Sequence, residues 1–77
     1  DEPTDAEKKR LALSYLMEAW EDAADAGVDL EILAHVGLFR AFADLVDIYG
    51  EDAVAELVET LPERIRAFEF SRPRVVQ

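Results

Sequence analysis

The stretch from Leu30 to Tyr49, LEILAHVGLFRAFADLVDIY, constrains the fold more than any other part of the chain. When it is placed on a helix at about 100° per residue, apolar side chains surround almost the whole circumference. The charged residues Arg40, Asp44 and Asp47 share one narrow strip. Such a helix must be covered on most sides. The sequence therefore predicts a largely buried central helix.

A long amphipathic helix is expected before it, over about residues 5–26. Thr4 and Glu7 have the spacing of a capping box, which satisfies free amides at a helix start. Gly27 suits the left-handed residue that ends a helix. The link to the central helix, expected over about residues 29–49, is therefore short, and short links join antiparallel helices.

Two shorter helices are expected after the central one, over about residues 51–60 and 62–69. Pro62 interrupts the helical pattern between them, because it lacks an amide and restricts the residue before it. Thr60 and Glu63 again have capping-box spacing, which favours a new helix start at this point.

These elements predict an all-α fold. We expect a small four-helix bundle, with two long antiparallel helices and two shorter C-terminal helices, as a single domain over residues 1–70 followed by a basic tail over 71–77. A chain of 77 residues builds only a small core, and domains of this size usually add disulfides, metals or oligomerisation. The absence of cysteine excludes disulfides and thiolate zinc sites. We therefore expect dimerisation to complete the bundle.

The central helix also predicts where the dimer forms. Its apolar arc is wider than the other helices of one chain can cover, and an uncovered apolar patch marks an interface. The expected homodimer interface consists of Ile32, Phe39, Phe42 and Val46. The side with Ala34, Gly37 and Ala41 is instead expected to admit another helix closely, with the alanines of the first helix as its counterpart.

Two further surfaces are candidates for binding a partner. Leu11 and Tyr15 lie off the apolar face of the first helix, beside acidic residues, and are expected to contact the C-terminal segment or a partner. Four arginines form the second surface, where residues 64–77 carry +3 against −13 for residues 1–63. The members of this second surface are Arg64, Arg66, Arg72 and Arg74.

The acidic composition points to a function in protein binding. With a net charge of −10, the chain repels nucleic acid and favours solubility or basic partners. We expect a non-enzymatic protein–protein interaction or regulatory module whose protein partner is unknown. The alternative is a nucleic-acid-binding protein that uses the two C-terminal helices as a helix-turn-helix with an arginine-rich end. The simpler interpretation is that these arginines pair with the protein's own carboxylates, within or between chains.

Catalytic and metal chemistry find little support. Glu31 and His35 are four residues apart, but no second histidine or Glu-x-x-His pair accompanies them, so we expect no metal site and interpret His35 as a packed side chain. The carboxylates from Glu18 to Asp25 are interpreted as a solvated helix face, or as a docking surface for a basic partner. No catalytic or cofactor motif is present, so we expect no enzyme activity, catalytic residue or cofactor.

The hydropathy pattern favours a soluble protein. Charges interrupt every apolar run before the ~18–20 residues that a membrane span needs, and no stretch has the layout of a signal peptide. The lack of cysteine is compatible with a reducing compartment. We expect a cytoplasmic location and no membrane partner.

Overall fold

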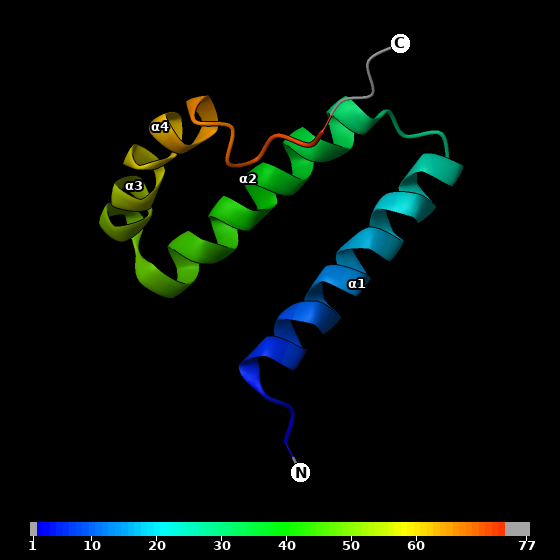
Figure 1. Ribbon diagram of the computed structural model, residues 1–77, viewed down its shortest axis with the longest axis horizontal. Coiled ribbons are helices and arrows are strands. Elements are labelled where there is room, and N and C mark those ends of the chain that lie inside the picture. Colours follow the sequence, from blue (N-terminus) through cyan, green and yellow to red (C-terminus); the bar gives the residue numbers. More distant parts are fainter. Residues whose placement is uncertain (1, 74–77) are drawn as a thin grey trace. The chain divides into compact units, whose positions relative to one another are not determined.

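The computed structural model describes residues 2–73, and all regular structure within them is helical, without a strand (Figure 1). The helices are α1 (Asp5–Asp25), α2 (Leu30–Tyr49), α3 (Glu51–Glu59) and the short α4 (Leu61–Arg66). The predicted all-α class is confirmed. The bundle arrangement, the single domain over residues 1–70 and the dimer stay predictions. No helix between residues 2 and 73 has the length and apolar character needed to cross a bilayer.

The residues divide into two compact units on either side of the Phe39–Arg40 bond. In the first unit, α1 begins as the capping box predicts, because the Glu7 N–H donates to the Thr4 hydroxyl oxygen at 3.2 Å. Gly27, with φ of +86°, ends α1. Its N–H and that of Val28 donate to carbonyls of the last turn, both at 3.0 Å, which is the hydrogen-bond pattern of a Schellman motif.

The N-terminal half of α2 contacts α1 at Gly37. A Cβ atom added to Gly37 would lie 2.9 Å from Cη2 of the Trp20 ring. The side of α2 that carries Gly37 therefore makes a close contact with α1, as predicted. The prediction that alanines of α1 lie at Gly37 was wrong, because the indole ring of Trp20 fills the space beside it.

The second unit turns at Gly50, whose φ is +87° and whose N–H donates to the Val46 carbonyl at 2.8 Å. Helices α3 and α4 follow and pack on each other. Val54 of α3 is 7% exposed, and it is the only apolar residue among residues 2–73 that is buried. The second unit is therefore built around very little buried apolar surface.

The passage from α3 to α4 differs from the sequence prediction. Thr60 has helical backbone angles, φ −82° and ψ −17°, and makes no side-chain cap to α4. Its hydroxyl instead donates to the Leu57 carbonyl at 2.7 Å. The capping box predicted from Thr60 and Glu63 is wrong, because the single residue between the two helices continues the helical path. The last helix, expected to reach residue 69, ends at Arg66.

Candidate interaction surfaces

Large apolar side chains are exposed on the helices of residues 2–73. On α1 they include Leu13, Leu16 and Met17, and on α2 they include Leu30 and Ile48. Each of these side chains has more than half of its surface exposed. They are therefore available to a second molecule.

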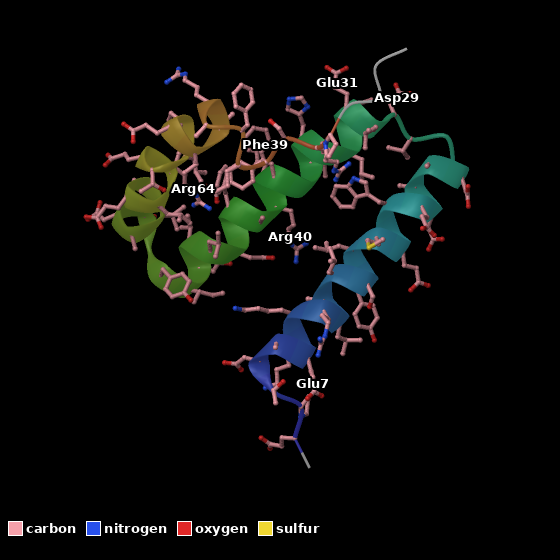
Figure 2. All side chains as sticks on the ribbon, in the orientation of Figure 1. Glu7, Asp29, Glu31, Phe39, Arg40 and Arg64 are labelled. Carbon is pink, nitrogen blue, oxygen red and sulfur yellow. The ribbon has the colours of Figure 1, made fainter. Side chains whose placement is uncertain are left out.

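The predicted dimer residues fall into two classes on α2. Ile32 and Phe39 are exposed, Phe39 to 64% of its surface, whereas Phe42 and Val46 are half-buried. Figure 2 labels Phe39 and its neighbour Arg40 on this helix. The guanidinium of Arg40 pairs with the Asp44 carboxylate at 3.2 Å on the polar strip of α2. Ile32 and Phe39 are thus the members of the predicted interface that a partner can reach directly.

Leu11 and Tyr15 are also exposed, Tyr15 to 66% of its surface. They lie on the opposite side of α1 from Trp20, as helical spacing requires. Glu18 and Asp22 follow on the same side at the next turns, and both are exposed. We call these four residues the Tyr15 stripe. It combines an apolar centre with carboxylates toward the C-terminal end of α1.

Arg64 holds the end of α4 together. Its Nε donates to Glu69 Oε2 at 2.8 Å and its Nη2 donates to Glu69 Oε1, so the ion pair is bidentate. The guanidinium also lies over the Phe70 ring, 5.3 Å from the ring centroid. The hydrogen bonds from Arg64 lower the pKa of the Glu69 carboxyl from its usual value. Arg64 thus pairs with a carboxylate of its own chain, and its side chain is half-buried.

Phe68 is the residue of this region that the sequence analysis missed. Its φ is +66°, in the left-handed region that glycine favours, and among residues 2–73 it is the one non-glycine residue with positive φ. Its N–H donates to the Ile65 carbonyl and the Glu69 N–H donates to the Arg64 carbonyl, both at 3.1 Å. This is the Schellman pattern seen at Gly27, with a phenylalanine at the glycine position.

The side chain of Phe68 is 76% exposed. The Schellman hydrogen bonds bring Arg64 and Glu69 together, where an apolar contact usually forms, and the ion pair replaces that contact. The only sequence signal was the presence of opposite charges five residues apart around Phe68. We call residues 64–72 the Phe68 turn.

The other three arginines of the predicted basic surface are Arg66, Arg72 and Arg74. Arg66 and Arg72 are exposed, and neither forms an ion pair within residues 2–73. Arg74 lies outside the described residues. The structure therefore separates Arg64, which has a partner within its own turn, from Arg66 and Arg72, which have side chains available to another molecule.

His35 is exposed rather than packed, which corrects the sequence interpretation. Its Nδ1–H donates to the Glu31 backbone carbonyl at 2.8 Å, one turn earlier in α2. The hydrogen bond is thus to the backbone of Glu31 and not to its carboxylate. Throughout residues 2–73, no three histidine or carboxylate side chains are grouped as metal ligands.

Comparison with known proteins gives no further guide to the site. No family model, curated protein or solved structure matches this chain.

Proposed function

We propose that this protein is a small, acidic, non-enzymatic module for protein–protein interaction, and that it acts as a homodimer through the exposed side of α2. The observation that carries this proposal is the exposure of large apolar side chains along that helix. Ile32 and Phe39 are exposed, whereas Val54 is the only apolar residue within residues 2–73 that is buried. Leaving such side chains in water forfeits the main source of folding free energy.

A second copy is the simplest partner for this surface. It brings the same apolar residues, and a two-fold interface places a patch against itself. The dimer then leaves the acidic face of α3 to bind other proteins.

The nucleic-acid alternative has less support. Helix α4 has six residues, which is short for a helix that must enter the major groove. Arg64, the first arginine of the basic end, is engaged with Glu69. The formal charge of −13 on residues 1–63 also repels a phosphate backbone.

Sedimentation equilibrium at micromolar concentration tests the proposed dimer. We expect twice the chain mass of 8.7 kDa for the natural protein. Phe39→Asp should weaken the dimer more than about 30-fold, because burying an unpaired carboxylate at an interface costs about 2 kcal/mol or more. Phe39 is preferable to Val46 for this test, because the half-buried Val46 also contributes to folding.

Arg40→Glu is the matched control. It also adds negative charge to α2, but on the polar strip, where it removes an exposed ion pair worth about 0.3–0.5 kcal/mol. The control should retain the dimer. A natural protein that sediments as a monomer and binds no apolar dye would refute the proposal.

A further inference from the structure

The Phe68 turn carries an unusual backbone conformation. Glycine takes the left-handed region at the ends of α1 and α2, at Gly27 and Gly50. At the end of α4 a phenylalanine takes it, although its Cβ makes that conformation unfavourable. Strain of this kind persists only where the surroundings hold it, and it is concentrated at functional sites.

The surroundings of Phe68 are well defined. The bidentate Arg64–Glu69 pair closes the turn across Phe68, and the Arg64 guanidinium packs on the Phe70 ring. The Ser71 N–H donates to the Phe68 carbonyl at 3.1 Å. The backbone is thus fixed on both sides of a side chain that is 76% exposed. An aromatic side chain presented on a fixed backbone loses little entropy on binding, which is typical of interface anchors.

The chemistry of its binding site follows from the neighbours of Phe68. Arg66 and Arg72 lie in the same turn and are exposed. A complementary surface therefore needs an apolar area beside carboxylates. The Tyr15 stripe has this composition, because Leu11 and Tyr15 supply the apolar area and the stripe also carries two carboxylates.

We propose that the Phe68 turn of one chain docks on the Tyr15 stripe of a second copy, with Arg66 and Arg72 facing Glu18 and Asp22. This inference rests on the proposed homodimer. Tyr15 and Phe68 are both exposed in the single chain, so each is available to another molecule. In a two-fold dimer the contact forms twice, once in each direction, and it joins the basic end of each chain to the acidic part of the other.

Phe68→Gly separates binding from folding. Glycine relieves the backbone strain at this position, so the resistance of α4 to unfolding should be unchanged or increased. Self-association should fall at least about tenfold, because the aromatic anchor is lost. A purely structural role for Phe68 would not lower association in a variant that folds equally well. Unchanged association of Phe68→Gly would overturn the inference.

Two charge-reversed variants test which surfaces meet. The first carries Arg66→Glu with Arg72→Glu, and the second carries Glu18→Lys with Asp22→Lys. Each variant alone should dimerise at least about tenfold more weakly than the natural chain, because four exposed ion pairs per dimer become repulsive contacts. In an equimolar mixture the reversed turn meets the reversed stripe, and the natural turn meets the natural stripe. The mixed dimer should therefore recover most of the natural affinity.

Sedimentation equilibrium of each variant and of the mixture gives the readout, with one variant isotopically labelled to identify the mixed dimer by mass. Recovery in the mixture supports contact between chains. Weakened variants without recovery indicate docking within one chain, and they overturn the inference. Variants that dimerise like the natural chain also overturn it while the proposed homodimer stands. A monomeric natural protein overturns both.

Discussion

Replacing Gly37 by alanine has two opposite effects on the stability of the chain, and the size of each can be estimated separately. Alanine favours the interior of a helix over glycine by about 0.8–1 kcal/mol. The added Cβ, however, would lie 2.9 Å from Cη2 of Trp20, closer than nonbonded carbon atoms approach. Either the indole ring or the backbone of α2 must move. The sign of the stability change therefore depends on Trp20.

The cost of that movement decides the result. Inserting a methyl group into a close contact typically costs about 1–3 kcal/mol. The Trp20 ring is half-buried and rigid, so it can yield only by tilting as a unit. After the helix-propensity gain of about 1 kcal/mol, Gly37→Ala should leave the natural chain between unchanged and about 2 kcal/mol less stable. In a Trp20→Leu background, which lacks the ring, the same change should stabilise by about 1 kcal/mol.

The double-mutant cycle is measured by urea unfolding of all four proteins at one protein concentration, followed by circular dichroism. We expect a coupling free energy of about 1–3 kcal/mol between the two positions. Trp20 is the only tryptophan of the chain, so its fluorescence reports the displaced ring independently. A displaced ring should emit at longer wavelength. Equal stabilisation by Gly37→Ala in both backgrounds would refute the contact between α1 and α2.

Two further predictions concern the ends of helices. Thr4→Ala should reduce the stability of α1 by about 1 kcal/mol, because the Glu7 N–H loses its side-chain acceptor. Thr4→Ser should retain the cap, because serine also carries a hydroxyl. Circular dichroism of both variants measures the difference. The pKa of Glu69 lies below its unfolded value in the folded chain, because Arg64 donates hydrogen bonds to the carboxylate. The ion pair therefore stabilises the Phe68 turn at pH values above the ordinary glutamate pKa. This stabilisation is lost as the pH falls through the lowered pKa of the folded chain. Side-chain NMR shifts of Phe68 during an acid titration should follow this loss, and Glu69→Gln should abolish the pH dependence.

Local signals in the sequence were enough to locate the helices. Glycines mark the end of α1 and the turn before α3, and Gly27 and Gly50 both have the positive φ that this role requires. The Thr4 cap also formed as its spacing predicts. In each case the signal and the structure lie within one helical turn, so no distant contact had to be known.

The end of α4 was not predictable in the same way. The sequence has no glycine there, and Phe68 takes the left-handed conformation while Arg64, Glu69 and Phe70 hold the turn around it. Spacing also misassigned Thr60, because a capping box needs an extended residue before the helix and the one-residue link is helical. Both errors arise where the conformation depends on several side chains together.

The contact at Gly37 illustrates what a periodic pattern leaves open. Small residues on one side of α2 indicate that something approaches closely, but the rotation of α1 about its axis selects which residue arrives. That rotation places Trp20 at α2 and turns Tyr15 outward. The rotation that brings Trp20 to α2 therefore also leaves the Tyr15 stripe, which the sequence pattern places off the apolar face, on the exposed side of α1.

The apolar character of α2 and the small amount of buried surface are best understood together. An isolated helix in water is marginal even with good helix formers, and most helices gain their stability from packing an apolar face. Within residues 2–73 that packing includes Trp20 against Gly37 and the surroundings of Val54. If a second copy covers Ile32 and Phe39, folding and association share one free energy, and stability then depends on protein concentration. The same side chains that make α2 a poor helix for a monomer make it suitable as the centre of a dimer.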